Sequence, residues 1–480
     1  MSKSDSIKTE RVFAYFEEIC AIPRGSENME QIAQYCVDFA ESHSLKVIKD
    51  NANNVIIFKP ATAGYENAEP IILQGHLDMV CQKEESSNID FLKDGIETFT
   101  DGDFIKAKGT TLGADNGIAV AMVLAILESD DIPHPAIEAV FTTDEEIGMF
   151  GAIALDTSVL KSKKMINLDA EEEDILTVSC AGGSDFKMII PINRTAANGT
   201  RADISFKGLR GGHSGVEINS GRINADILAG RLLNHLNNVC KFELISINGG
   251  DKGNAIPNNC NITLCVDNAK AFSDEAIKYL EIIKTEIAEH EPEFNYAITI
   301  EETKEYDVID SNTKDKLIFA LLCAPDGVYR MSADIDGLVE SSQNLGVLQT
   351  NEDNILMHFT LRSNKVSALE FLEDKMKAFS KCIPCTIDTS GHYPPWEYNS
   401  NSRLRELYKE CFAEQFGFEA KVEAIHAGLE CGIFASKIND FDCIAMGPAL
   451  YDVHTVNERL SISSAKKIYK LLINILKKCR

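Results

Sequence analysis

The sequence has no long apolar run. No stretch approaches the roughly 18 consecutive apolar residues that a membrane-spanning helix needs. The N-terminal residues 1–11 are polar and charged, and they lack the apolar core of a secretion signal. We therefore expect the protein to stay in the cytoplasm, where it is made.

Positive charge is also scarce. Lysine and arginine total 47 against 74 acidic residues, a formal net charge of −27. Such a surface repels phosphate backbones and anionic lipids, so we expect no nucleic-acid or membrane partner. Paired Cys-x-x-Cys motifs are absent as well, because only Cys382 and Cys385 have this spacing, and we interpret them as structural. The 14 cysteines are scattered through apolar runs, as expected for reduced thiols in a cytosol.

The chain does contain enough apolar material for a large core. Hydrophobic residues make up 44% of the 480 residues and charged residues 25%, the composition of an ordinary globular protein. A chain of this length exceeds one compact core, so two domains are expected. No low-complexity linker or short repeat interrupts it.

The first part of the chain alternates helical and strand patterns. Apolar residues at helical spacing predict helices over 12–19 and 29–39. Residues 116–128 are apolar nearly all round, which is typical of a buried crossover helix between parallel strands. Short apolar runs predict buried strands at 55–58, 71–73, 139–142, 165–168 and 175–178.

After residue 184 the pattern changes to strands with clearer alternation, mixed with amphipathic helices. We expect an α+β domain over 186–393, inserted into a discontinuous α/β domain formed by 1–185 and 394–480. The α/β domain should have a mostly parallel sheet covered by helices. The insert is predicted to contain strands at 202–206, 261–266, 297–300 and 355–361 and helices at 223–236, 276–287 and 367–379. Beyond it, helices are predicted at 404–416 and 465–478, and a strand at 442–446.

Metal-type side chains follow three of the predicted strands of the α/β domain, each just beyond the end of its strand. Ligands of a parallel sheet gather beyond the carboxyl ends of the strands, so these side chains should share one rim. The residues are His76, Asp78, Glu145, Glu146 and Asp169.

Two further residues could join this rim. Asp115 comes just before the buried helix, and His454 follows the strand predicted at 442–446. Singly each has an ordinary explanation, since an aspartate in that position is a good helix N-cap and a loop histidine is usually exposed. Together, two histidines and several carboxylates without thiolates suit two zinc ions, or related divalent metals, that share a bridging carboxylate.

At these residues the sequence resembles the M20 metallopeptidases. The shared order is His-x-Asp at His76, Gly-Ala-Asp-Asn-Gly around Asp115, Glu-Glu-x-Gly at Glu145, Asn-Leu-Asp-Ala-Glu around Asp169, and a late His454. The long insert and the GLECG segment at 428–432 look more like the aminoacyl-histidine (Xaa-His) dipeptidases of that family than like its deacetylases or tripeptidases.

The resemblance implies a role for each residue of the rim. Asp115 would bridge two zinc ions, one also held by His76 and Asp169, the other by Glu146 and His454. Asp78 would accept the second ring N–H of His76 and fix the orientation of the ring. Glu145, next to a ligand but not one itself, would be the general base.

The insert contains segments that resemble the lid of the family. GGHSG around His213 resembles its histidine loop, and NAIP from Asn254 resembles its asparagine motif. Arg362, at the end of a predicted strand, could bind a carboxylate, and a surface arginine is an equally good explanation. Glu430 could receive the free amine of a substrate, whereas His426 near it is interpreted as structural.

The resemblance implies metal-dependent hydrolysis of dipeptides, including Xaa-His and β-Ala-His substrates. Two zinc ions, with Co²⁺ or Mn²⁺ as substitutes, would lower the pKa of a bridging water, and Glu145 would take its proton. A lid carrying His213 and Asn254 would close over the substrate during turnover. The chain could also form a homodimer, with His213 acting in its own chain or in the partner chain.

Three other hypotheses stay open. Another M20 hydrolase, such as an N-acyl amino acid deacylase or a broad exopeptidase, would use the same metals on a different bond. A non-catalytic metal-binding protein would use the acids only to hold cations. A thiol hydrolase would use Cys81 close to His76, but that histidine already belongs to the ligand set.

Overall fold

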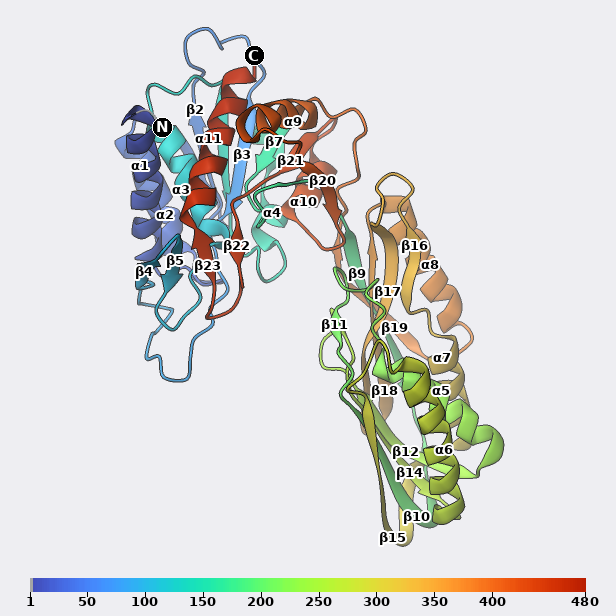
Figure 1. Cartoon of the computed structure of the whole chain (residues 1–480). Helices are drawn as coiled ribbons and strands as arrows, with labels where there is room; N and C mark the ends of the chain where they lie inside the picture. Colours follow the sequence, from blue (N-terminus) through green and yellow to red (C-terminus); the bar gives the residue numbers. More distant parts are fainter. Residues whose placement is uncertain (1–2) are drawn as a thin grey trace. The chain divides into compact units, whose positions relative to one another are not determined.

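The computed structural model describes residues 3–480, which form two compact units (Figure 1). The first unit consists of the residues up to Cys180 together with Tyr398–Ala424 and Leu429–Arg480. The second consists of Ala181–Glu397 and Ile425–Gly428. The boundaries predicted from the sequence are instead 185/186 and 393/394, with the short segment 425–428 in the first domain. The chain therefore passes between the units four times.

An eight-stranded sheet forms the centre of the first unit. In spatial order its strands are β1 (Lys46–Lys49), β2 (Val55–Lys59), β6 (Ile137–Thr142), β3 (Ile71–His76), β7 (Lys164–Asn167), β21 (Asp442–Ala445), β8 (Ile175–Cys180) and β20 (Lys421–Ile425). The four central strands β6, β3, β7 and β21 are parallel. On either side β2 and β8 join them antiparallel. The predicted parallel arrangement is thus confirmed for the centre of the sheet, where the metal-type residues follow.

The buried crossover helix predicted at 116–128 is α3 (Ala114–Glu128). It packs against β3, and α1 (Lys3–Cys20) packs against α3, so that every residue from Asn116 to Leu127 is buried (Figure 1). This double coverage explains why α3 has no polar face. The remaining helices of the unit are α2 (Glu30–Ser42), α4 (Phe150–Ala154), α9 (Arg403–Phe416), α10 (Glu430–Lys437) and α11 (Ile462–Lys478), with a 3₁₀ turn at Thr157–Val159.

A small four-stranded sheet joins two segments of the first unit that are far apart in the sequence. Its strands are β22 (Leu450–Tyr451), β23 (Arg459–Ser461), β5 (Phe104–Ala107) and β4 (Thr98–Asp101), in that order. The turn that carries His454 connects β22 to β23, so pairing of β23 with β5 anchors this turn to the body of the unit.

The second unit is built on a nine-stranded antiparallel sheet. Its main order is β15 (Asn295–Ile309), β10 (Arg194–Lys207), β14 (Cys260–Val266), β12 (Phe242–Gly249), β17 (Val339–Thr350), β18 (Asn354–Ser363), β9 (Gly182–Pro191) and β19 (Thr386–Tyr393), and β16 (Gly327–Met331) pairs with β17. Four helices pack on one face and enclose the core of the unit (Figure 1). They are α5 (Ala225–Val239), α6 (Ala269–Ile287), α7 (Ser311–Cys323) and α8 (Val366–Ser380). A two-stranded ribbon of β11 (Gly212–His213) and β13 (Ala255–Ile256) completes the unit.

The structure also describes the cysteines and the apolar character of the helices. All 14 cysteines are free thiols, including Cys382 and Cys385. Within residues 3–480, no helix has both the length and the apolar character needed to cross a membrane.

Phe359 on β18 tests the core of the second unit. Its side chain is fully buried, so truncation to alanine would leave a cavity among packed neighbours. We expect Phe359→Ala to lower the free energy of unfolding by about 3–5 kcal/mol. The single tryptophan, Trp396, is buried in the same unit, and its fluorescence during urea denaturation measures the change.

Phe371→Ala is the matched control. Phe371 lies on α8 of the same unit with half of its surface exposed (50%), so its removal creates no internal cavity. The free energy of unfolding should change by no more than about 0.5 kcal/mol. Equal losses in the two variants would contradict the core described for this unit.

Candidate metal centre

The loops that follow the central parallel strands begin at the same level of the sheet. In the register, His76 at the end of β3 lies opposite Thr142 at the end of β6, and Gln74 lies opposite Asn167 at the end of β7. Each strand therefore delivers its following residues to one edge. The predicted residues in these loops are Asp78, Glu145, Glu146 and Asp169.

Asp115 lies between the two predicted histidines. Its Oδ1 is 3.1 Å from Nε2 of His76, and its Oδ2 is 3.1 Å from Nε2 of His454. The backbone of Asp115 is not helical (φ −80°, ψ 108°), although the residue lies within the first turn of α3. Each carboxylate oxygen thus faces a different imidazole, the arrangement expected of a carboxylate that bridges two cations.

Each imidazole also has a second carboxylate beside the same nitrogen. Asp169 Oδ1 lies 3.5 Å from Nε2 of His76, and Glu146 Oε1 lies 3.0 Å from Nε2 of His454. A ring nitrogen carries at most one hydrogen, so it cannot satisfy two carboxylates fully. The donors form two groups of three that share Asp115, and they consist of imidazole nitrogen and carboxylate oxygen without thiolate. This donor set fits zinc or a related divalent cation in each group.

Crowded carboxylates dominate the electrostatics of this cluster. Burial opposes ionisation of Asp115, but hydrogen bonds from His454 and His76 outweigh it and lower the pKa of that carboxyl. Hydrogen bonds to Asp115 and Glu146 raise the pKa of His454 to about 11. Burial, with the charges of Asp115 and Glu146, raises the pKa of Asp169 to about 6 against the opposing effect of His76. Carboxylates held this close need positive charge among them, from imidazolium or from a cation.

Asp78 supports the cluster from behind. Its Oδ1 lies 3.3 Å from Nδ1 of His76, and the residue is fully buried. The same carboxylate accepts the backbone N–H groups of Glu145 (3.0 Å) and Glu146 (3.2 Å). In a neutral His76 ring, the contact at Nδ1 would keep the proton there, and the Nε2 lone pair would be available to a cation. Asp78 therefore orients both the histidine and the loop of the two glutamates.

Glu145 lies beside the two groups of three. Among the described residues, the carboxylates that contact Nε2 of His76 or His454 are those of Asp115, Asp169 and Glu146, and Glu145 is not one of them. The charge of His76 nevertheless acts on Glu145. Burial raises the pKa of Glu145 well above its usual range, and neighbouring carboxylates add to the effect. A carboxyl group whose pKa is raised in this way suits general acid–base chemistry.

Comparisons with known proteins identify the family of the chain. The model of peptidase family M20/M25/M40 matches residues 72–478. The chain belongs to this family. It is 36% identical over 482 residues to the cytosol non-specific dipeptidase of Escherichia coli, covering 99% of both chains.

Solved structures place this M20 peptidase among similar folds. The crystal structure of aminoacylhistidine dipeptidase from Vibrio alginolyticus is 35% identical, covers 98% of this chain and 96% of its own, and superposes with a TM-score of 0.89. The aminopeptidase PepT from Bacillus cereus, at 16% identity, 98% coverage of both chains and a TM-score of 0.57, shares the fold.

Glu430 of this M20 peptidase lies in the interior of the first unit, not at an open surface. It is 0% exposed, and its Oε2 accepts hydrogen bonds from the side chains of Gln74 and Thr142. Gln74 is in turn bonded to Asn167 through its Oε1. The predicted contact with a substrate amine is not favoured by this position, because the carboxyl group is fully buried and bonded to two strand residues. The network instead cross-links the ends of β3, β6 and β7 beneath the cluster.

The remaining predicted residues lie in the second unit. His213 on β11 pairs with β13, and the Ser214 N–H donates to the Asn254 carbonyl oxygen, so the two lid segments are adjacent. Arg362, only 6% exposed, donates to the hydroxyl oxygen of Tyr393 (2.7 Å) and is therefore not the free surface arginine of the simpler explanation. Burial and the charge of Arg362 both lower the pKa of His213.

The hydrogen bonds of His213 fix its tautomer. Its Nδ1 accepts the backbone N–H groups of Gly215 (3.1 Å) and Val216 (3.2 Å), so in the neutral ring the proton is on Nε2. Nε2 can then only donate. A half-buried donor of this kind suits stabilisation of an oxygen that becomes negative during a reaction.

Three supporting residues were not identified from the sequence. Asn116 donates to Asp169 Oδ1 (2.8 Å) and accepts from the His76 N–H (3.2 Å), and its position directly after Asp115 was the available signal. Arg24 and Glu458 contact the backbone around Asp115, but each is far from it along the chain, and a single sequence contains no signal of such contacts.

The thiol alternative finds no support at Cys81. Burial raises the pKa of this thiol, whereas a nucleophilic cysteine needs a lowered pKa. Its Sγ donates to the Met79 carbonyl oxygen.

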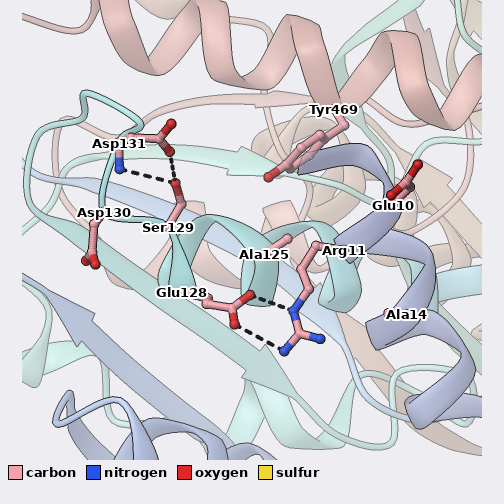
Figure 2. A pocket seen from close by; sticks show the side chains of 9 residues that line it. All are labelled: Glu10, Arg11, Ala14, Ala125, Glu128, Ser129, Asp130, Asp131 and Tyr469. Carbon is pink, nitrogen blue, oxygen red and sulfur yellow. Dashed lines mark hydrogen bonds and ion pairs between the residues drawn. The ribbon is translucent and has the colours of Figure 1, made fainter. Parts of the chain in front are cut away.

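A separate pocket of about 550 Å³ lies in the first unit, and Figure 2 shows side chains that line it. It is bordered by the end of α3, and Asp115 lies at the opposite end of that helix, roughly 20 Å away for a helix of this length. Arg11 spans it with a two-pronged ion pair to Glu128 (2.7 and 3.1 Å), as Figure 2 shows. The pocket is therefore not part of the candidate centre.

His426 generates a prediction about acid stability. It is buried between Ser342 and Asn364, and burial with the charge of Arg362 lowers its pKa from 6.5 to about 3. As the pH falls, His426 is therefore protonated at a higher pH in the unfolded chain than in the folded chain. The contribution of the neutral imidazole to the free energy of unfolding is complete above pH 6.5 and is lost as the pH falls towards 3.

Relative to His426→Gln, the wild type should lose up to about 1.4 kcal/mol of unfolding free energy per pH unit below 6.5. Urea denaturation followed by Trp396 fluorescence at a series of pH values measures both proteins. Parallel pH profiles would contradict a neutral buried imidazole.

Proposed function

We propose that the chain is a metal-dependent dipeptidase and that its first unit is the catalytic domain. The observation that carries the proposal is the position of Asp115, with one carboxylate oxygen 3.1 Å from His76 and the other 3.1 Å from His454. Full-length similarity to two proteins named as dipeptidases, at 36% and 35% identity, supports the choice of substrate class.

The proposed complement is two zinc ions per chain, with Co²⁺ or Mn²⁺ as substitutes. His76 and Asp169 would hold one, Glu146 and His454 the other, and Asp115 both. When bound, such cations supply Lewis acidity that lowers the pKa of water and polarises a carbonyl group.

The residues of the chain have distinct proposed roles. The Glu145 carboxylate accepts a proton from the attacking water and passes it to the departing amine, which its raised pKa supports. Asp78 keeps His76 and the glutamate loop in place. In the second unit, which we propose to be the lid domain, His213 donates from Nε2 to the developing oxyanion. Arg362 and Asn254 are proposed to bind the substrate.

The proposed substrates are dipeptides with a free amine, including Xaa-His and β-Ala-His. The names of the two similar proteins differ on this point, since one is a non-specific dipeptidase and the other an aminoacylhistidine dipeptidase. We therefore expect cleavage of Xaa-His dipeptides, and measurement of other dipeptides decides how strict the requirement for histidine is.

Glu145→Gln separates catalysis from metal binding. Because Glu145 is proposed as a base and not a ligand, the variant should keep its bound zinc while kcat falls by about 10²- to 10⁴-fold. Metal content by atomic emission and hydrolysis of a Xaa-His dipeptide are the two measurements. Unchanged hydrolysis would favour a different role for this residue, and absence of hydrolysis in the wild type would favour a protein that only binds metal.

Asp144→Asn is the matched control on the same loop. Asp144 accepts the backbone N–H of Glu27, a hydrogen bond that asparagine can also accept, and the charge lost equals that lost in Glu145→Gln. This variant should retain nearly full activity. A loss equal to that of Glu145→Gln would show that the loop, and not the base, had been disturbed.

Removal and replacement of the metal tests the reaction class. Treatment with a chelator should abolish hydrolysis of free-amine dipeptides, and added Zn²⁺, Co²⁺ or Mn²⁺ should restore it, whereas alkylation of thiols should have little effect. N-acyl amino acids should not be cleaved. Cleavage of the acylated compounds alone would select the deacylase alternative.

Assembly and location are further proposals. A homodimer would allow His213 to act in the partner chain, and sedimentation velocity of the purified protein tests for it. A cytoplasmic location is proposed because the Escherichia coli relative is named a cytosol dipeptidase.

A further inference from the structure

A buried glutamate behind the metal centre accepts four consecutive backbone N–H groups. Glu458 is 3% exposed. Its Oε2 accepts the N–H groups of Leu112 (2.7 Å) and Gly113 (3.0 Å), and its Oε1 accepts those of Ala114 (2.8 Å) and Asp115 (3.4 Å). One side chain thus holds the whole segment that leads into Asp115.

The position of these N–H groups explains why an acid is needed there. They belong to the first turn of α3 and the residues before it, where backbone N–H groups have no partner within the helix. Gly113 occupies the N-cap position and has no side chain that could accept them. The carboxylate of Glu458, from a remote segment, accepts these N–H groups in place of an N-cap side chain. Its negative charge is favourable at a helix N-terminus.

Arg24 holds the same segment from the opposite side. Its guanidinium donates to the carbonyl oxygens of Leu77 (2.9 Å), Asp78 (3.0 Å) and Gly113. Gly113 has a left-handed φ of 71°, and a Cβ atom there would lie 2.5 Å from Nη2 of Arg24. The Gly113 residue is therefore bound through its N–H by Glu458 and through its carbonyl oxygen by Arg24.

These contacts link three segments that carry proposed metal ligands. Glu458 belongs to the turn of His454, where its own N–H donates to the Thr455 carbonyl oxygen (3.2 Å). Arg24 contacts the loop directly after His76. The segment before Asp115 is thus tied to the segments of both histidines.

We propose that Glu458 is a positioning residue of the metal centre, which fixes the bridging carboxylate of Asp115 relative to His454 and thereby strengthens cation binding. The inference rests on the proposed metal centre. It differs from general stabilisation, because a merely structural glutamate would affect unfolding and leave the affinity for the cation unchanged.

Glu138 supplies a matched comparison. It is also buried (4% exposed), and its carboxylate accepts the backbone N–H groups of Lys161 and Ser162 at 2.9–3.1 Å. It lies near the start of β6, whereas the residues of the metal centre follow the end of that strand. Replacement by glutamine disturbs a similar set of hydrogen bonds at the far end of the sheet.

The experiment measures zinc affinity in the full-length protein by competition with a chromogenic chelator, and it measures the melting temperature of chelator-treated protein. In E458Q an NH₂ group replaces one oxygen and faces two N–H donors, without a change in side-chain volume. We expect zinc affinity to fall about 10- to 100-fold in E458Q. E138Q should bind zinc with the affinity of the wild type, even if its melting temperature falls as much as that of E458Q. E458D, which keeps the charge but is too short to reach all four N–H groups, should also bind zinc more weakly.

The outcomes separate this proposal from the proposed function. A wild type that binds no zinc would overturn the metal centre itself. If the wild type binds zinc and both E458Q and E458D bind it with the same affinity, only the role of Glu458 is overturned. Equal loss of affinity in E138Q, or failure of both Glu458 variants to fold, would show that the residue serves general stability and would also overturn it.

Discussion

The main constraint on the first unit is the repulsion between carboxylates gathered at one edge of a buried sheet. The contacts around these carboxylates have to balance that repulsion. Asp115, Glu146 and Asp169 are each largely buried, and they lie within hydrogen-bonding distance or little more of the buried His76 or the partly exposed His454. Such an arrangement is unfavourable unless positive charge lies among the oxygens. Imidazolium supplies part of it, and divalent cations would supply more. The cluster therefore needs a backbone that holds the carboxylates together and positive charge that balances them.

The surrounding residues meet this constraint through the backbone. Asp78, Glu458 and Arg24 each bind several main-chain groups of the loops that carry the acids, and Gln74 and Asn167 cross-link the strands beneath. Rigid loops keep the carboxylates in place when repulsion would separate them. The same rigidity lowers the cost of organising a metal site, because its donors need not be collected when the cation arrives.

Sequence patterns predict those strands and helices whose residues form a continuous or periodic apolar run. The strands β3, β6 and β7 and the buried helix α3 have continuous apolar runs, and the acids that follow the strands were found for that reason. Strand β17 was missed because residues 340–344 (ESSQN) are polar yet buried, so hydrophobic periodicity contains no trace of it. The contacts of Glu458 join residues more than 340 positions apart, and a single chain without its fold shows no such pairing.

The metal centre explains hydrolysis better than it explains choice of substrate. In the proposed mechanism its groups act on water and on the peptide bond, which every dipeptide contains, so the same centre would serve a strict and a broad enzyme equally well. Discrimination between dipeptides requires groups that contact a substrate side chain. A pocket that hydrogen-bonds an imidazole rejects substrates that lack the imidazole, because the polar groups of the pocket would then be left unpaired. Two relatives of nearly equal identity with names of different breadth are consistent with this division. If the proposed roles hold, residues outside the cluster set the range of dipeptides, and that range can change while the centre stays the same.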